Sequence, residues 1–342
     1  MEYLEVDRRP HRRSVGELHK LGGYGLSPAE LAAAGRSYAG SSPRAGMDPG
    51  ARLAYMDAAG VDVSILYPSL ALFWETEVQD GELADAYCRA YNRWIVDFCA
   101  DSGGRLVPIA HISLGDVARA VRELERAVRS GARGAFVAPH TITRRPHGHP
   151  DHDPFFARAA ELGIPVGIHP NLEPKPPMAS VHFDDMRGQT FFFVATSIFA
   201  VQAAFTTLFQ YGTFERFPGL RVVVLETGAG WISAWLDRLD SKFESVGRLD
   251  PRMKTPPGDL FRRQCWISCD PDERTVPAII DLVGDDRFLW SSDYPHSEAK
   301  PGAMRDLATL CEALAPRARE RLLGSNAARL YGIDRGGRST AP

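Results

Sequence analysis

The feature that most constrains the fold of this chain is a regular alternation of short apolar runs with longer amphipathic stretches. Most of the runs are continuously apolar and rich in β-branched residues, which is typical of strands buried on both faces of a parallel sheet. The runs are residues 61–68, 105–113, 132–139, 164–171, 220–228, 265–270 and 287–295. A β-then-α order that repeats without a linker predicts a (β/α)8 TIM barrel rather than an open, doubly wound sheet.

Helical spacing of apolar residues marks the stretches between these runs. We predict helices at residues 82–100, 115–130, 153–163, 231–246, 273–283, 302–314 and 316–331, and a mostly helical segment at 189–217. No GxGxxG, GxxxxGK[ST] or GxSxG motif occurs, so dinucleotide-binding, P-loop and serine-hydrolase functions have no support.

The predicted barrel is one strand short, and the missing strand should come first, before a helix near residues 52–59. Residues 2–6 (EYLEV) are a candidate strand, but the chain from there to Gly50 is rich in Gly, Ser, Pro and Arg and carries no clear helix. Either EYLEV closes the barrel in a degenerate way, or the first β/α unit is missing. We therefore divide the chain into an irregular segment (1–48), a barrel (49–333) and a disordered tail (334–342).

The overall composition excludes several classes of protein. A net charge of −3 gives no general attraction to nucleic acid, and no apolar run reaches the roughly 18–20 residues of a membrane span. The N-terminus has no apolar signal-peptide core. Five cysteines without a CxxC pair support neither a disulfide framework nor a thiolate zinc site, and Cys265 and Cys269 share one strand face as packing residues. We expect a cytoplasmic protein.

Polar residues gather where the apolar runs end, which is where (β/α)8 barrels carry their active sites. His169, Glu226 and Asp293 form the sharpest set. An imidazole and carboxylates that converge at a barrel mouth suit a divalent cation such as Zn, Mn or Fe(II), which activates a bound water or polarises a carbonyl. Each residue also has a structural alternative: a hydrogen-bonded packing histidine, a helix-capping glutamate and a turn-forming aspartate.

Other polar and aromatic residues are weaker candidates. His111 ends one run, His182 lies in a long loop, and Trp74 is either core or pocket wall; we expect all three near the substrate pocket. The sequence HGHPDH, which holds His147 and His152, is rich in Pro and Gly, and its context predicts a solvated loop rather than a metal site.

Several segments together resemble the amidohydrolase-related family. They are ARLAYMDAAGVDVSILYPSL, AYNRWIVDFCA, RLVPIAHISL, GIPVGIHPN, FERFPGLRVVVLETGAGWISAWLDRLD, RFLWSSDYPHSE and GSNAARLYG, spanning roughly residues 48–333. The resemblance is to the branch that includes aminocarboxymuconate-semialdehyde decarboxylase and related aromatic-acid decarboxylases. It implies a distorted TIM barrel, one divalent metal (zinc first, iron or manganese as alternatives), and hydrolase or non-oxidative carboxy-lyase chemistry. It also makes a dimer a reasonable expectation.

By position in that resemblance, His169 matches a metal-binding histidine. Asp293 matches an aspartate that binds metal and handles protons, and His296 and Glu298 match a loop that shapes the substrate pocket. This chain departs from the family in two places. The family's first strand carries an acidic residue or His followed two residues later by His, whereas residues 1–13 contain only His11. Glu226 stands near the position where the decarboxylases carry an acid–base histidine.

We therefore expect a metal-dependent hydrolase or non-oxidative decarboxylase of a small carboxylate-bearing substrate. Asp293 and Glu226 would serve as metal ligands and proton acceptors, and His296 as a pocket acid. The missing first motif, which would follow from a chain that starts downstream of the full family N-terminus, leaves a second hypothesis: a metal-poor, non-catalytic subunit that pairs with a complete homologue. A third keeps the fold but makes the protein an iron- or manganese-dependent oxygenase or a dinuclear hydrolase.

Overall fold

Seven parallel strands form one curled sheet in the computed structural model, which describes residues 2–6, 8–10, 18–35, 37–171 and 195–333. Each strand pairs with the next along the chain, in the order β3-β4-β5-β6-β7-β8-β9. The strands are β3 (Ser64–Leu66), β4 (Leu106–His111), β5 (Gly134–Val137), β6 (Pro165–Ile168), β7 (Arg221–Val224), β8 (Cys265–Cys269) and β9 (Phe288–Trp290). Every predicted run contains one of them, so the parallel α/β architecture is confirmed as a curled half-barrel.

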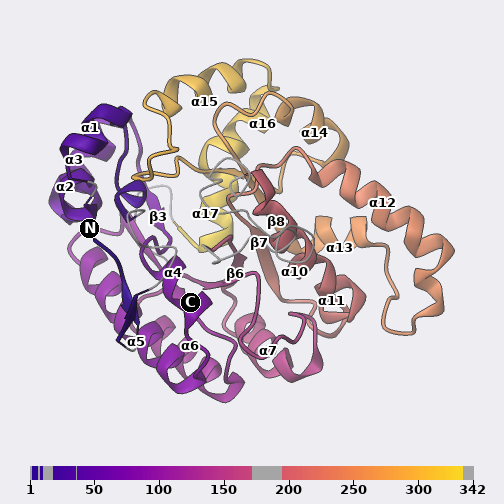
Figure 1. The fold of residues 1–342 in the computed structure, drawn as a ribbon. Helices are drawn as coiled ribbons and strands as arrows, with labels where there is room; N and C mark the ends of the chain where they lie inside the picture. The colour runs from indigo at the N-terminus through magenta and orange to yellow at the C-terminus, as the bar shows by residue number, and fades with distance from the viewer. Residues whose placement is uncertain (1, 7, 11–17, 36, 172–194, 334–342) are drawn as a thin grey trace.

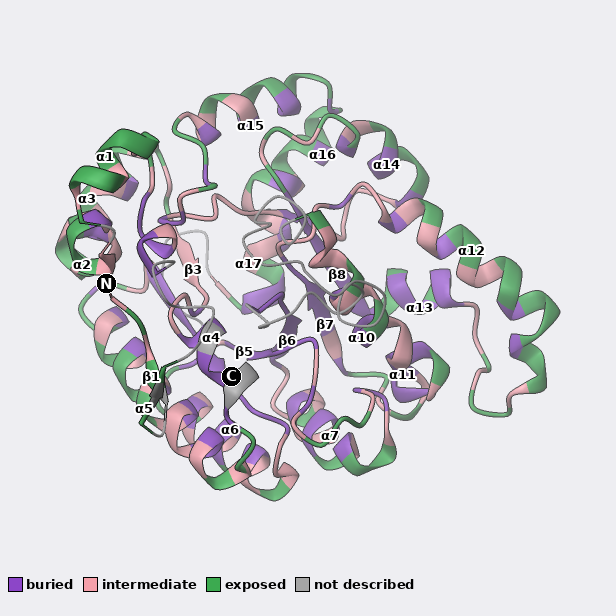
Figure 2. Ribbon diagram, viewed as in Figure 1, coloured by how far each residue is buried: buried purple, intermediate pink, exposed green. Residues whose placement is uncertain are grey.

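Helices surround the sheet, with their buried faces turned toward it and their exposed faces turned outward (Figures 1 and 2). They are α3 (Pro49–Ala59), α4 (Ala71–Glu77), α5 (Gly81–Cys99), α6 (Val117–Arg129), α7 (Asp153–Glu161), α10 (Ile198–Gln210), α11 (Thr213–Arg216), α12 (Ile232–Ser245), α13 (Pro257–Gln264), α14 (Val276–Val283), α15 (Ala303–Glu312), α16 (Pro316–Glu320) and α17 (Asn326–Tyr331). Within the described ranges, none is long and apolar enough to cross a membrane.

Within the described residues the predicted helices are confirmed, with three differences in detail. The 316–331 stretch is broken into α16 and α17 by a π-helical turn, η5 (Arg321–Ser325), in which Gly324 leaves helical geometry. The helices α4 and α13 were not predicted, because each is short and lies inside a stretch that looks like a loop. Of the predicted 189–217 segment, residues 189–194 lie outside the described residues, and left-handed Gly212 separates α10 from α11.

The EYLEV segment does not join the parallel sheet. Its β1 (Glu5–Val6) pairs antiparallel with β2 (Arg9–Pro10), so in the described part of the chain the barrel has no eighth strand and stays open between β3 and β9. The C-terminal helix α17 contacts both edges of the sheet. Its Tyr331 hydroxyl lies 2.8 Å from the hydroxyl of Tyr67, just after β3, and its Leu330 belongs to the same buried cluster as Leu289 of β9.

The prediction that the N-terminal segment carries no clear helix is wrong. Short helices occur there: η1 (Leu18–Leu21), α1 (Pro28–Ala33), α2 (Tyr38–Ser41) and η2 (Arg44–Gly46). The physical reason is local capping. The Ser27 hydroxyl accepts from the Glu30 amide while the Glu30 carboxylate accepts from the Ser27 amide, which is a complete capping box.

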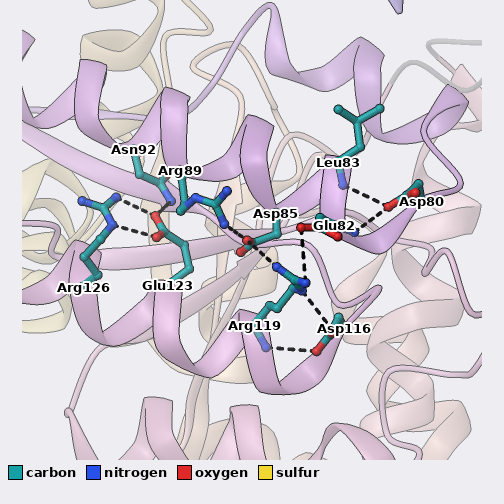
Figure 3. A network of polar contacts seen from close by, with 10 residues as sticks. All are labelled: Asp80, Glu82, Leu83, Asp85, Arg89, Asn92, Asp116, Arg119, Glu123 and Arg126. Atoms are coloured by element: carbon teal, nitrogen blue, oxygen red, sulfur yellow. Dashed lines mark hydrogen bonds and ion pairs between the residues drawn. The ribbon is translucent and has the colours of Figure 1, made fainter. Parts of the chain in front are cut away.

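A polar network joins α5 and α6 (Figure 3). Its Asn92 also fixes the end of β4. Asn92 accepts from the backbone N–H of His111 at 2.7 Å and donates to its carbonyl at 3.0 Å, and it also donates to Glu123 at 2.7 Å. Arg126 in turn holds Glu123 through two hydrogen bonds. The network leaves the last residue of β4 with both backbone groups satisfied. Elsewhere in the core, Cys265 and Cys269 are buried free thiols, which confirms their packing role.

Candidate active site

The carboxyl ends of β6, β7 and β9 bring His169, Glu226 and Asp293 to one end of the sheet, as the sequence predicts. Glu226 and Asp293 both have left-handed backbone conformations, with φ of 49° and 53°. Such conformations are rare for residues other than glycine and cost about 1–3 kcal/mol each. The left-handed backbone at each residue therefore sets the direction in which its carboxylate leaves the end of the strand.

His169 is positioned by its two ring nitrogens. Its Nδ1 lies 2.6 Å from the carbonyl of Pro170, and because that carbonyl can only accept, Nδ1 carries the proton. The Nε2 atom faces the Glu226 carboxylate in direct contact. Burial lowers the pKa of His169, but the Glu226 carboxylate outweighs burial and raises that pKa. Because Nδ1 is held by the Pro170 carbonyl, Nε2 is the ring nitrogen that a metal beside Glu226 would bind.

A second imidazole–carboxylate pair lies beside the first. The Nδ1 atom of His296 is 2.7 Å from Asp293, and its Nε2 atom is 3.2 Å from the Ser69 hydroxyl. Glu298 follows two residues later in the same loop. Ligand atoms of Glu226, Asp293, His296 and Glu298 all lie within 4.8 Å of one another, so one ion could reach all four.

These residues open into a cavity of about 630 Å³, a volume typical of small-molecule sites. Two parts of the chain far from the strand ends complete its wall: Lys20 and Leu21 of η1, and the N-terminal turn of α15. Backbone hydrogen bonds tie the N-terminal segment there, from Ser297 to Lys20 at 2.7 Å and from Tyr24 to Pro295 at 3.1 Å.

The cavity is strongly acidic. Its described lining residues include two lysines, Lys20 and Lys300, and a larger number of carboxylates. The carboxylates are those of Glu226, Asp270, Asp272, Glu273, Asp293, Glu298 and Asp306. Lys300 is also paired with Asp272. An anionic substrate would therefore be repelled from this cavity unless a cation were bound with it.

The crowding of charges shifts the pKa values of the cavity groups. Burial raises the pKa of Asp270 to about 6, and the neighbouring Glu273 adds to the shift. Burial also raises the pKa of Asp293, against the opposing effect of His296. Burial alone lowers the pKa of His296, but the Asp293 carboxylate, with Glu226 behind it, outweighs burial and raises that pKa to about 10.

The donor set fits a divalent metal. The closely spaced carboxylates supply hard oxygen ligands, His169 and His296 supply imidazole nitrogens, and the described cysteines are buried. Oxygen-rich sets with few nitrogens favour manganese, magnesium or iron over a thiolate-bound zinc. His11, the only histidine among residues 1–13, lies outside the described residues.

Two predicted pocket residues, His111 and Trp74, are not among the described residues that line the cavity. His111 is 1% exposed, and its Nε2 atom is 2.7 Å from the Glu75 carboxylate. The Trp74 ring lies over it with a centroid distance of 4.6 Å. The Glu75 partner was not foreseen, because α4 brings it to β4 only in the folded chain. His182, the third predicted pocket residue, lies outside the described residues.

The prediction of a solvated HGHPDH loop is wrong for two of its histidines. His147 and His152 are 2% and 1% exposed. His147 Nε2 donates to the Ala138 carbonyl at 2.8 Å, and His152 Nδ1 donates to the His147 carbonyl at 3.1 Å. These bonds fasten the loop to the end of β5. The histidine side chains therefore supply hydrogen-bond donors to buried backbone carbonyls, which an irregular loop cannot pair through regular secondary structure.

Comparison with known sequences places this architecture among related proteins. A profile of the amidohydrolase family matches residues 20–333. Gamma-resorcylate decarboxylase from Rhodococcus jostii (strain RHA1) is 28% identical over 307 residues, which cover 83% of this chain and 87% of that protein.

Solved structures show the same fold. Amidohydrolase map2389c from Mycobacterium avium subsp. paratuberculosis K-10 aligns with a TM-score of 0.76 and 23% identity, covering 90% of this chain and 80% of that one. A 2,6-dihydroxybenzoate decarboxylase in complex with 2,6-dihydroxybenzoate aligns with a TM-score of 0.67 and 25% identity, covering 82% and 86%. A dihydroxybenzoic acid decarboxylase from Polaromonas sp. JS666, with bound manganese and 2-nitroresorcinol, aligns with a TM-score of 0.67 and 21% identity. The alignment covers 82% of this chain and 84% of that one.

Proposed function

This chain belongs to the amidohydrolase family, and from that premise we propose that it is a metal-dependent, non-oxidative decarboxylase of a small aromatic carboxylate. The observation that carries the proposal is the donor group of Glu226, Asp293, His296 and Glu298, whose ligand atoms lie within 4.8 Å of one another on a cavity of small-molecule size, with His169 in contact with Glu226. The decarboxylase relatives support carboxy-lyase chemistry over the hydrolytic alternative.

In this proposal, His169 Nε2 and the carboxylates of Glu226 and Asp293 hold the metal, with Glu298 within reach. Manganese suits this oxygen-rich set better than the zinc expected from the sequence, and the Polaromonas structure contains manganese. When bound, the cation supplies positive charge that offsets the acidic lining and attracts the substrate carboxylate.

The chain's own residues handle the proton that the reaction consumes. Decarboxylation without oxidation replaces the carboxylate by hydrogen: the ring carbon gains a proton, its bond to the carboxylate carbon breaks, and that electron pair restores the aromatic ring as CO2 leaves. A proton shared between Asp293 and His296, whose atoms are 2.7 Å apart, lies on the cavity wall where it can reach the ring. Ser69 orients the imidazole from its other nitrogen.

The direct test loads the purified protein with Mn²⁺, supplies 2,6-dihydroxybenzoate, and measures CO2 release. Wild-type protein should release CO2, and Asp293→Asn should lower the rate by at least about 10²-fold, since the variant loses both the charge and the proton. Asp272→Asn is the matched control: it removes a cavity carboxylate that pairs with Lys300 and should keep most of the activity. Full activity in Asp293→Asn would refute the assignment.

Metal content separates the proposal from the alternatives in which the chain is a non-catalytic subunit or an oxygenase. Elemental analysis after metal loading and dialysis should find close to one equivalent of divalent metal per chain. Less than about a tenth of an equivalent favours the metal-poor subunit, and dependence of turnover on O2 favours the oxygenase. Assembly as a homodimer or with a homologue stays a prediction, which light scattering of the purified protein tests.

A further inference from the structure

We infer that Glu273 is a positioning residue for Glu226: its carboxylate holds the turn after β7, and the turn in turn fixes where the Glu226 carboxylate lies. The inference rests on the proposed function, because Glu226 matters to the reaction as a metal ligand. Glu273 itself lies in the loop between β8 and α14, and among the described residues it is not a member of the donor group that could hold one ion.

The carboxylate of Glu273 accepts hydrogen bonds from two loops at once. The backbone N–H of Ala229 donates to both of its oxygens, at 2.9 Å and 2.8 Å, and the backbone N–H of Gly230 donates to Oε1. From its own loop, the backbone N–H of Asp270 donates at 3.4 Å and the Thr275 hydroxyl at 3.5 Å. Although Glu273 lines the cavity, its carboxylate thus joins the loop after β7 to the loop after β8.

The turn after β7 fits closely around this carboxylate. A Cβ atom placed on Gly230 would lie 2.9 Å from Oε1 of Glu273, and one placed on Gly228 would lie 3.4 Å from the same oxygen. Gly228 also has a left-handed backbone, with φ of 61°. A side chain at Gly230 would therefore push the carboxylate away, and the glycines let the two loops approach each other through it.

Glu226 needs such a support because its backbone is left-handed, with φ of 49°. A glutamate keeps that conformation only where the surrounding contacts enforce it. Its own N–H group makes a long hydrogen bond of 3.3 Å to the Ser268 hydroxyl. The bonds from Ala229 to the charged Glu273 carboxylate are shorter and fix the other end of the turn. Release of the turn would let Glu226 leave its place beside His169 and weaken metal binding.

The test measures Mn²⁺ affinity by equilibrium dialysis in Glu273→Asp, which keeps the negative charge but is one methylene too short to hold both loops. The affinity should fall about 10-fold. In a Glu226→Gln background, where the positioned ligand is already lost, the same change should alter the affinity by no more than about 2-fold. An equal fall in both backgrounds would show that Glu273 acts on the ion without Glu226, and would overturn the inference.

The control Asp240→Asn separates positioning from a merely structural role. Asp240 also accepts a backbone N–H at the start of a helix, from Gly258 of α13 at 2.8 Å, but it is not among the described residues that line the cavity. Both variants should lower the midpoint of urea unfolding, whereas only Glu273→Asp should weaken Mn²⁺ binding. A lowered midpoint with unchanged Mn²⁺ affinity in Glu273→Asp would refute the inference.

Hydrogen exchange of the metal-free protein keeps the inference separate from the proposed function. Peptides that contain Ala229 and Gly230 should exchange at least about 10-fold faster in Glu273→Asp than in wild type, because their N–H groups lose a charged acceptor. Peptides from 291–298 should exchange equally in both proteins. Wild-type protein that binds no Mn²⁺ would refute the proposed function. The exchange rates would then decide whether Glu273 holds the turn, and equal rates would overturn the inference.

Discussion

The buried His147 should make the stability of this protein fall in mild acid. Its side chain is almost inaccessible, and burial lowers its pKa from 6.5 to about 4, with the nearby His152 and His140 adding to the shift and Glu75 opposing it. The hydrogen bond from Nε2 to the Ala138 carbonyl needs only the neutral ring. The folded protein therefore excludes a proton that the unfolded chain accepts.

The sign and size of the effect follow from the two pKa values. Between 6.5 and about 4 the unfolded state binds more protons than the folded state, so stability falls as the pH falls. Each pKa unit corresponds to about 1.4 kcal/mol. The contribution of His147 should reach about 2 kcal/mol at about pH 5, and about 3 kcal/mol below the folded-state pKa.

Urea unfolding at about pH 7 and about pH 5 measures this contribution. The variant His147→Gln keeps an N–H group that can donate to the Ala138 carbonyl but does not titrate, so it should lose about 2 kcal/mol less than wild type between the two pH values. The control His149→Gln removes a histidine whose side chain is 33% exposed and should follow wild type. Equal pH dependence in wild type and His147→Gln would refute the reasoning.

Three further outcomes are expected. Asn92→Leu should lower the free energy of unfolding in urea by about 3 kcal/mol, since it leaves the buried N–H and carbonyl of His111 without partners; a loss under about 1 kcal/mol contradicts the network. Glu226→Gln should weaken Mn²⁺ binding at least about 10-fold in equilibrium dialysis, and unchanged affinity excludes Glu226 as a ligand. Metal-free protein should bind benzoate at least about 10-fold more weakly than Mn²⁺-loaded protein in calorimetry, because the acidic lining repels it; equal affinities contradict the role of the cation.

The parts of the fold that were predicted correctly are those in which local pattern and burial agree. Strands such as β4, β5 and β6 are buried throughout, so their sequences are continuously apolar, and the helices that follow show one apolar face. The parallel order then brings the strand ends together. For this reason His169, Glu226 and Asp293 could be placed at one end of the sheet without knowledge of the structure.

The parts that could not be predicted depend on contacts between distant segments. The composition of HGHPDH is that of a solvated loop, but the loop packs over the end of β5 and buries His147. Glu75 meets His111 only because α4 folds back onto β4. Likewise, η1 brings Lys20 to the cavity through a backbone bond to the loop after β9. A single sequence carries no signal for such pairings.

The backbone at Glu226 and Asp293 gives an independent reason to regard this end of the sheet as functional. Glycine adopts a left-handed φ at little cost, whereas these two residues hold it at a cost of about 1–3 kcal/mol each. Their charges add a second cost, visible in the raised pKa of the neighbouring Asp270. Both costs arise from keeping carboxylates at these two positions, and a bound cation offsets the electrostatic one. Glycine at either position would relieve the backbone strain but would also remove the carboxylate that pairs with His169 or His296, so Glu226→Gly and Asp293→Gly should abolish metal binding, which equilibrium dialysis with Mn²⁺ measures.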